Sequence, residues 1–140
     1  MGRSYWFECA KCGYRARVSG RADRGLSFYV QTILCRDCRE LYDAVIRLRV
    51  PDELAGWGGS GPLRSGKGAA AVPVLTAPPN FQAVLNRLTL TGARRSRWLP
   101  FKAQCPVSAI HRIRSWNDPD HCPRCGIFLD KSAVPYRLWD

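Results

Sequence analysis

The sequence predicts a small metal-stabilised α+β protein, mostly β, that consists of two modules joined by a flexible linker. Three observations support this prediction. Seven cysteines occur in 140 residues, and six of them belong to Cys-x-x-Cys pairs. A segment rich in glycine and proline divides the cysteines into two groups. Around the pairs, apolar residues alternate with charged ones, which is the pattern of a strand with one buried face.

The first group of cysteines, in residues 1–50, has the spacing of a metal site. Two Cys-x-x-Cys pairs are separated by 22 residues, and a turn at each pair can direct both of its sulfurs at one ion. Four thiolates supply the tetrahedral shell of soft ligands that zinc accepts. We therefore expect a first zinc site with the ligands Cys9, Cys12, Cys35 and Cys38.

The residues around these pairs predict strands. Apolar residues occupy every second position in "YRARV" (14–18) and "AVIRLRV" (44–50), and "LSFYVQTIL" (26–34) is rich in β-branched and aromatic residues. Together these segments predict a three-stranded antiparallel sheet that the metal holds together. Its solvent face would carry Arg15, Arg17, Arg47 and Arg49.

The middle of the chain, residues 51–80, predicts a flexible linker. It contains six glycines and five prolines in thirty residues, and its apolar residues follow neither the period of a strand nor that of a helix. Such a segment cannot bury enough apolar surface to offset the entropy of ordering it.

The second module, residues 81–140, begins with a predicted short helix. Apolar residues recur at helical spacing from Phe81 to Leu88, and Asn80 is a suitable N-cap. The segment "GARRSRW" follows, with Arg94, Arg95 and Arg97 beside Trp98. Arginine next to an aromatic side chain suits contact with a phosphate and a stacked base, and it equally suits a solvated loop.

The second group of cysteines lacks one thiolate. Cys122 and Cys125 form a complete pair, but Ser108 stands where the partner of Cys105 is expected, and a hydroxyl is a poor zinc ligand. His111 is our preferred fourth ligand, with His121 or an incomplete site as alternatives. The predicted second site is Cys105, His111, Cys122 and Cys125, which gives two Zn²⁺ per chain.

Two resemblances follow from these motifs. Residues 5–50 resemble a zinc ribbon, and the layout of the whole chain is similar to small bacterial zinc-ribbon proteins, whose function is generally unassigned. Locally, "CAKCGY" and "CPRCG" resemble the two knuckles of rubredoxin, which hold one iron through four cysteines. The second resemblance implies an iron electron carrier as a minor alternative, because a shell of four thiolates accepts either metal.

The charge of the chain favours a polyanionic partner. The formal net charge is +11, and both ends are basic while residues 51–80 balance. We expect nucleic acid or a nucleoprotein complex as the partner, with RNA favoured over DNA because no segment predicts a helix suited to a major groove. The expected contacts are Arg15, Arg17, Arg47, Arg49, Arg94, Arg95, Arg97 and Trp98. The alternative is an adaptor that binds proteins, in which the arginines only maintain solubility.

The sequence does not predict an enzyme, a membrane protein or a small-molecule substrate. It has no H-x-E with P-C-x-x-C of zinc deaminases, no set of serine, histidine and carboxylate, and no glycine-rich phosphate loop. No apolar run approaches the roughly 20 residues that span a bilayer. Paired cysteines without a signal peptide lead us to expect a cytoplasmic location.

Overall fold

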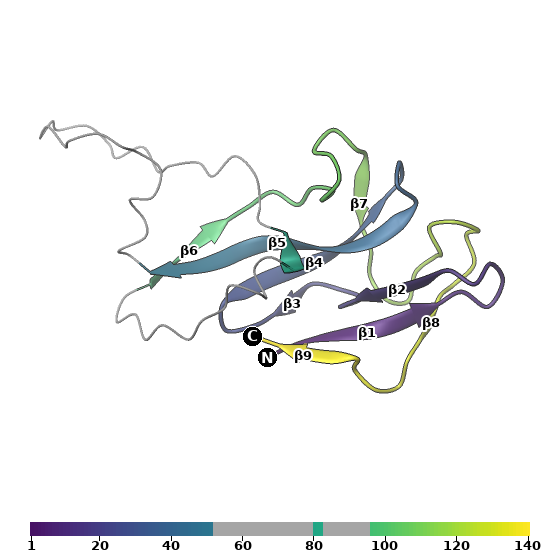
Figure 1. The fold of residues 1–140 in the computed structure, drawn as a ribbon, viewed down its shortest axis with the longest axis horizontal. Coiled ribbons are helices and arrows are strands. Elements are labelled where there is room, and N and C mark those ends of the chain that lie inside the picture. Colours follow the sequence, from purple (N-terminus) through teal and green to yellow (C-terminus); the bar gives the residue numbers. More distant parts are fainter. Residues whose placement is uncertain (52–79, 83–95) are drawn as a thin grey trace, which may run out of the picture.

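The computed structural model describes residues 1–51, 80–82 and 96–140, which form two small sheets stacked on each other (Figure 1). In these residues no helix is long and apolar enough to cross a membrane. The strands are β1 (Gly2–Glu8), β2 (Arg15–Val18), β3 (Asp23–Arg24), β4 (Phe28–Cys35), β5 (Glu40–Pro51), β6 (Ser96–Pro100), β7 (Ile113–Ser115), β8 (Asp130–Lys131) and β9 (Arg137–Trp139).

Each sheet combines strands from both ends of the chain. In the first sheet the order is β2-β1-β8, and β9 also pairs with β1. In the second sheet the order is β3-β4-β5-β6, and β7 also pairs with β4. All of these pairings are antiparallel. Both sheets are therefore completed by strands that come after residue 95.

This strand pairing corrects the expectation of two self-contained modules, 1–50 and 81–140. The residues after β7 form β8 and β9 along β1, and Trp139 pairs with Gly2 near the two termini (Figure 1). The physical reason is that a small sheet leaves unpaired backbone groups at its edges, and here the strands of one half pair with the edges of the other. The expected linker 51–80 lies outside the described residues at positions 52–79.

The predicted helix is described only at its start. The side-chain oxygen of Asn80 accepts a hydrogen bond from the amide of Gln82 at 2.8 Å, which is the contact of an N-cap. Residues 83–95, which hold the rest of the predicted helix and also Arg94 and Arg95, lie outside the described residues.

The three segments predicted as strands are strands, but they do not form one sheet. β4 and β5 make the expected hairpin, whereas β2 pairs with β1, a strand that the sequence analysis did not identify. The chain leaves the first sheet at Gly20, whose φ is 83° and whose position would bring a Cβ within 2.6 Å of the Phe7 ring. Only glycine fits this crossing without strain.

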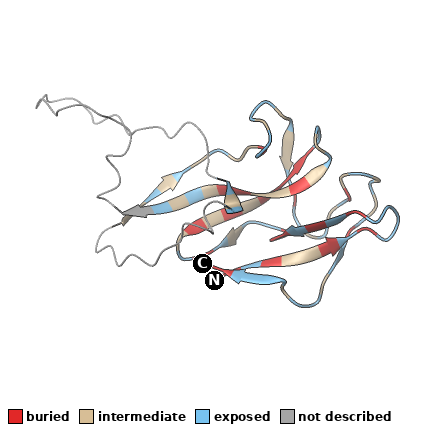
Figure 2. Ribbon diagram, viewed as in Figure 1, coloured by how far each residue is buried: buried red, intermediate tan, exposed pale blue. Residues whose placement is uncertain are grey.

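The core lies between the two sheets, as the buried positions in Figure 2 show. Phe7, Ala16 and Val18 from the first sheet pack with Leu34 and Leu41 from the second. The Trp116 side chain is fully buried in the same cluster. A second cluster forms near the termini, where Phe28 of β4 stacks on Trp139 of β9 with ring centroids 4.5 Å apart.

A polar network also joins the sheets. The hydroxyl of Thr32 in β4 donates to the Asp43 carboxylate in β5 at 2.7 Å and accepts from the Gly20 amide at 2.9 Å. The amide and hydroxyl of Ser19, just after β2, donate to the same carboxylate. Burial of Asp43 raises its pKa to about 6 even with these donors. The network therefore fixes the end of the first sheet to the second.

We expect the substitution Thr32→Val to destabilise the fold by about 1–3 kcal/mol, because it leaves the buried Gly20 amide without an acceptor and removes a donor from Asp43. Urea denaturation at a fixed, saturating zinc concentration measures the change. Ser115→Ala, at an exposed position of β7, is the control and should change stability by less than about 0.5 kcal/mol. Equal stability of the two variants would mean that the network contributes nothing.

The interleaved sheets also predict how a cut chain behaves. A single cut at a protease site introduced between residues 52 and 79 should leave the two pieces bound to each other, because they share both sheets and both candidate metal sites. They should elute together from a sizing column and separate only after chelation. Pieces that separate while metal is bound would restore the picture of independent modules.

Candidate metal centres

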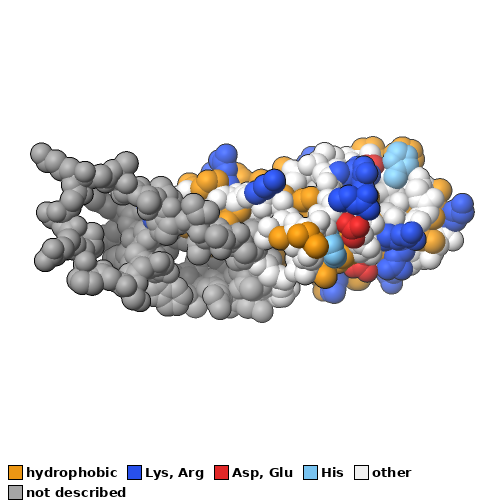
Figure 3. Space-filling view, turned by 90° about the horizontal axis from the view of Figure 1, so that it is seen from above, with side chains coloured by type: hydrophobic (Ala, Val, Ile, Leu, Met, Phe, Trp, Pro, Cys, Tyr) orange, Lys and Arg blue, Asp and Glu red, His pale blue; other side chains and the backbone are white. Residues whose placement is uncertain are grey.

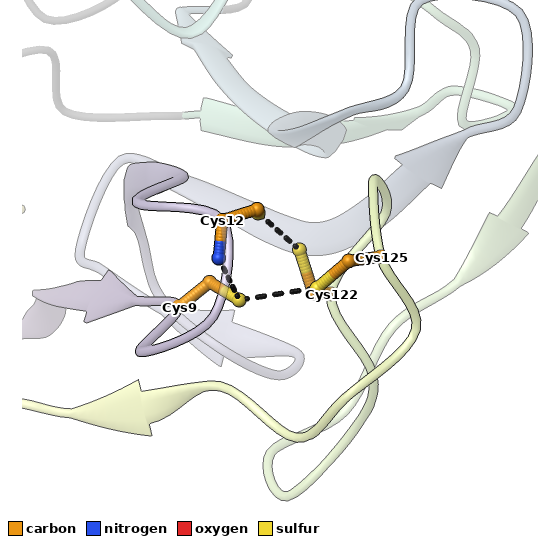
Figure 4. Close-up of side chains that lie close together, drawn as sticks. All are labelled: Cys9, Cys12, Cys122 and Cys125. Carbon is orange, nitrogen blue, oxygen red and sulfur yellow. Dashed lines mark hydrogen bonds between the residues drawn. The ribbon is translucent and has the colours of Figure 1, made fainter.

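The first candidate centre brings together Cys9, Cys12, Cys122 and Cys125 (Figure 4). The first two lie in the turn between β1 and β2, and the other two lie in the loop between β7 and β8. The ligand atoms of all four lie within 4.8 Å of one another, and their side chains converge in Figure 4. All seven cysteines of the chain are free thiols.

The two turns of this centre have the same backbone geometry. The Cys9 amide donates to the Tyr14 carbonyl, and the Gly13 amide donates to the Cys9 carbonyl. The equivalent bonds run from Cys122 to the Ile127 carbonyl and from Gly126 to the Cys122 carbonyl. Gly13 and Gly126 have φ of 71° and 80°. This left-handed conformation is unstrained in glycine, which explains why each pair is followed by that residue.

The sulfur positions fit one tetrahedral ion. The Cys9 and Cys125 sulfurs are 3.2 Å apart, and those of Cys12 and Cys122 are 3.7 Å apart. Sulfurs bound at about 2.3 Å to a tetrahedral ion stand about 3.8 Å from one another. The four thiols therefore need only small shifts to bind one ion.

The second candidate centre brings together Cys35, Cys38, Cys105 and His111. Cys35 ends β4, and Cys38 lies in the tight turn to β5, where Arg39 has a positive φ of 52°. Cys105 and His111 come from the loop between β6 and β7. The Nδ1 atom of His111 lies 3.4 Å from the Cys38 sulfur and 3.7 Å from the Cys35 sulfur. These separations fit a shared tetrahedral ion bound through Nδ1.

The structure answers the question of the missing fourth ligand with His111. Ser108 contributes through its backbone, because its carbonyl accepts the His111 amide and turns the chain so that the imidazole faces the cysteines. His121 lies elsewhere, with Nδ1 3.1 Å from the Asp120 carboxylate and its ring against Phe128. The sequence left three alternatives for the fourth ligand: His111, His121 or none. The geometry matches His111.

The eight ligands are those expected, but their grouping is different. The sequence predicts that Cys9 and Cys12 share a site with Cys35 and Cys38, and that Cys105 and His111 share one with Cys122 and Cys125. The structure instead joins each N-terminal pair to a C-terminal pair of ligands. The first centre has the two knuckles noted for their resemblance to rubredoxin, now together in space.

The physical reason for this difference is the placement of the hairpins. The turn after β1 and the turn after β4 belong to different sheets, so their cysteines do not share a site. Separation along the chain is a weak guide, because the entropy of closing a loop grows slowly with its length. Cys12 and Cys122 are 110 residues apart. The loop from Cys12 to Cys35 spans only 23 residues, but closing the longer loop costs only about 1.4 kcal/mol more in entropy.

Backbone amides donate hydrogen bonds to four of the ligand sulfurs and stabilise negative charge on them. Amides donate to Cys9, Cys35, Cys105 and Cys122 at 3.3–3.5 Å. The Cys12 amide is the main reason that the pKa of Cys9 falls to about 6. Burial acts to raise the pKa of Cys105, but the amides of Ser108 and Val107 help to bring it down to about 7. The lowered pKa values favour the thiolate at Cys9 in the first centre and at Cys105 in the second, and the thiolate is the form of cysteine that binds a metal.

A short ion-pair network fixes the loop that carries Cys122 and Cys125. The Arg114 guanidinium donates to the Asp120 carboxylate at 2.7 Å, and this bond lowers the pKa of Asp120 to about 2. The indole of the buried Trp116 donates to the His121 carbonyl at 2.9 Å. These contacts position the residue just before Cys122.

The predicted nucleic-acid contacts fall on two separate surfaces. Arg15 and Arg17 project from β2 in the first sheet, whereas Arg47 and Arg49 project from β5 in the second. The expected single row of four arginines is therefore wrong. Arg97 and Trp98 are neighbours in β6, and neighbouring residues of a strand point to opposite faces. They cannot act as one cluster on one surface.

Trp98 and the β5 arginines form a surface with two residues that the sequence analysis missed. Tyr29 pairs with Arg47 and with Arg24, and Arg49 pairs with Trp98, so all five side chains share one face of the second sheet. We call this the Tyr29 face: Arg24, Tyr29, Arg47, Arg49 and Trp98. The alternating pattern of "SFYVQ" could have revealed Tyr29, because Phe28 and Val30 on either side of it are buried.

Comparisons with known proteins give no relative for this chain. No family model, no curated protein and no solved structure matches it.

We expect the wild-type chain to bind two metal ions, and double substitutions should reveal how the ligands are grouped. The pair Cys12→Ser and Cys125→Ser removes two ligands from one centre and should leave one ion per chain. The pair Cys12→Ser and Cys38→Ser removes one ligand from each centre and should cost both ions. Elemental analysis of purified protein measures both. The reverse result would support the grouping inferred from the sequence.

Proposed function

We propose that this chain is a non-catalytic zinc protein whose two ions hold a β-sandwich that binds single-stranded nucleic acid, preferably RNA. The observation that carries the proposal is the Tyr29 face, on which arginines lie beside the exposed Trp98 ring and the partly buried Tyr29 ring of the second sheet. The two metal centres carry the structural part of the proposal.

Zinc is the proposed metal because of the ligand sets. Sulfur and imidazole ligands in tetrahedral arrangement are typical of zinc, and the imidazole in the second centre is a ligand that zinc readily accepts. Each set has four protein ligands, so no coordination position is left open for a substrate. Closed sites of this kind are structural. A red, iron-containing preparation would instead favour the electron-carrier alternative for the centre with four thiolates.

The contacts within the Tyr29 face support nucleic-acid binding. The guanidinium groups of Arg24 and Arg47 lie 5.3 Å and 5.6 Å from the centre of the Tyr29 ring. Trp98 meets the same ring edge-on at 4.9 Å and is 37% exposed. Stacking on an aromatic ring holds a guanidinium in a defined plane while its N–H groups remain available to a phosphate. Figure 3 looks onto the molecule from the side of the second sheet, where basic side chains are interspersed with hydrophobic and a few acidic ones.

RNA in single-stranded form suits such a face better than a duplex. Unpaired bases can stack on exposed rings, and each stacked base contributes about 1–3 kcal/mol. The described residues contain no helix that could enter a major groove. Stacking combined with phosphate contacts gives affinity with little sequence preference.

The test compares substitutions of the rings and of the arginines. Tyr29→Ala with Trp98→Ala should weaken binding of a short single-stranded RNA by about 10-fold to 100-fold, because it removes a stacking platform. Arg47→Glu with Arg49→Glu should weaken binding and also reduce its dependence on salt, because fewer counterions are released. Fluorescence anisotropy at two salt concentrations measures both effects.

The control variant makes the same change of charge elsewhere. Arg21→Glu with Arg36→Glu alters two exposed arginines outside the Tyr29 face. Its affinity should fall less than that of Arg47→Glu with Arg49→Glu. Equal losses of affinity in the two variants would mean that only the net charge of the protein matters. Undetectable RNA binding by the wild-type protein would overturn the proposal.

A protein-interaction adaptor is the second candidate, and one observation favours it. The loop between the ligands Cys105 and His111 exposes two apolar side chains, Val107 at 66% and Ile110 at 89%. A metal that fixes both ends of the loop would present them rigidly. Binding that resists salt and is lost on Val107→Ser with Ile110→Ser would identify the adaptor.

A further inference from the structure

We infer that the outer face of the first sheet binds a second segment of single-stranded RNA, so that one chain holds two segments on opposite sides. This inference rests on the proposed function of the Tyr29 face but concerns different residues. Its basis is a second group of stacked arginines and aromatic rings, which we call the Trp6 face: Trp6, Arg15, Arg17 and Tyr136.

The register of the first sheet places this group on one face. Trp6 of β1 pairs with Arg17 of β2, so their side chains project on the same side. Arg15 lies two residues before Arg17 and therefore shares that side. Their neighbours Phe7 and Ala16 are buried in the core, which puts the Trp6 face on the outside of the sandwich.

The contacts within the Trp6 face repeat those of the Tyr29 face. The guanidinium groups of Arg15 and Arg17 lie 4.7 Å and 5.2 Å from the centre of the Trp6 ring. Arg17 also donates to the Tyr136 hydroxyl at 3.0 Å, and Tyr136 meets Trp6 edge-on at 5.4 Å. Both arginines are exposed, and Tyr136 is 50% exposed. A phosphate can therefore reach two oriented guanidinium groups beside the exposed Tyr136 ring and the partly buried Trp6 ring.

A hollow adjoins the Trp6 face. It has a volume of about 500 Å³ and is lined by Trp6, Tyr14, Arg15, Arg17 and Arg124 together with Gly13, Ala16, Glu40 and Leu41. Arg124 lies 4.7 Å from the centre of the Tyr14 ring, which adds a third stacked arginine. Two carboxylates also belong to this region, since Glu8 pairs with Arg15 at 3.5 Å and Glu40 with Arg124 at 3.2 Å. Among the charged residues that line the hollow itself, three are arginines and one, Glu40, is a carboxylate, which suits a polyanion.

The two faces point away from each other. The inner surfaces of the sheets meet in the core, where Phe28 of the second sheet stacks on Trp139 of the first. The Tyr29 face and the Trp6 face are the outer surfaces of the same two sheets, which pack about 10 Å apart. Two short RNA segments could therefore bind at once without competing for contacts.

Such a protein would join two RNA segments or two parts of one strand. Once one face has bound, the other face meets RNA of the same strand at high local concentration, so a long strand should bind more tightly than a short one. A strand too short to reach both faces should bind to each face independently.

The test counts short strands per chain. Native mass spectrometry with a hexauridylate at low salt should find two strands on the wild-type chain. Arg15→Glu with Arg17→Glu should leave one strand, Arg47→Glu with Arg49→Glu should also leave one, and the combination should leave none. Each variant must retain the metal content of the wild type. If one variant loses metal, glutamine replaces glutamate at the same positions.

The outcomes separate this inference from the proposed function. One strand per wild-type chain, unchanged by Arg15→Glu with Arg17→Glu but lost with Arg47→Glu and Arg49→Glu, would overturn the second site and keep the first. No strand on the wild-type chain would overturn both.

Discussion

Each candidate metal centre joins a hairpin turn from the first fifty residues to a loop from the last forty, and most of the fold depends on these two connections. The sheets are small, and several of their strands have only two or three residues. Strands of this length contribute little stability on their own. An ion that binds two distant turns provides the energy that a small core lacks. Loss of metal should therefore affect the pairing of both sheets and not only the two sites.

The same two connections support the outer faces. The first centre is built on the turn between β1 and β2, and these strands carry Trp6, Arg15 and Arg17. The second centre is built on the turn between β4 and β5, which carry Tyr29, Arg47 and Arg49. Each hairpin thus has the ligands of a candidate metal centre at one end and stacked arginines along its outer face. The strand pairing keeps the rings and guanidinium groups of each face in register.

Local chemistry was readable from the sequence, whereas long-range pairing was not. All eight ligands could be identified because their signals are local. These signals are the Cys-x-x-Cys spacing, the glycine that follows two of the three pairs, and a serine, Ser108, where a thiolate is expected. The grouping of those ligands depends on which strands pair, and the energetic cost of a distant partner is too small to exclude it. Alternation identified β2 and β5, and β-branched and aromatic residues identified β4, but neither pattern says which sheet a strand joins. The strand β1 was missed because its three consecutive aromatic residues hide the alternation.

The position of residues 52–95 has a consequence for how this chain can vary in evolution. Pro51 and Ser96 are paired neighbours at the ends of β5 and β6, so the two ends of this interval lie side by side. Among the described residues of the interval, Asn80 bridges to Ala44 and Phe81 packs against Phe28 and Trp139. The nine strands of the described residues and all eight ligands lie outside it. Insertions and deletions here change neither a register nor a ligand. Homologous chains should therefore align closely before residue 51 and after residue 96, and differ most in length between them.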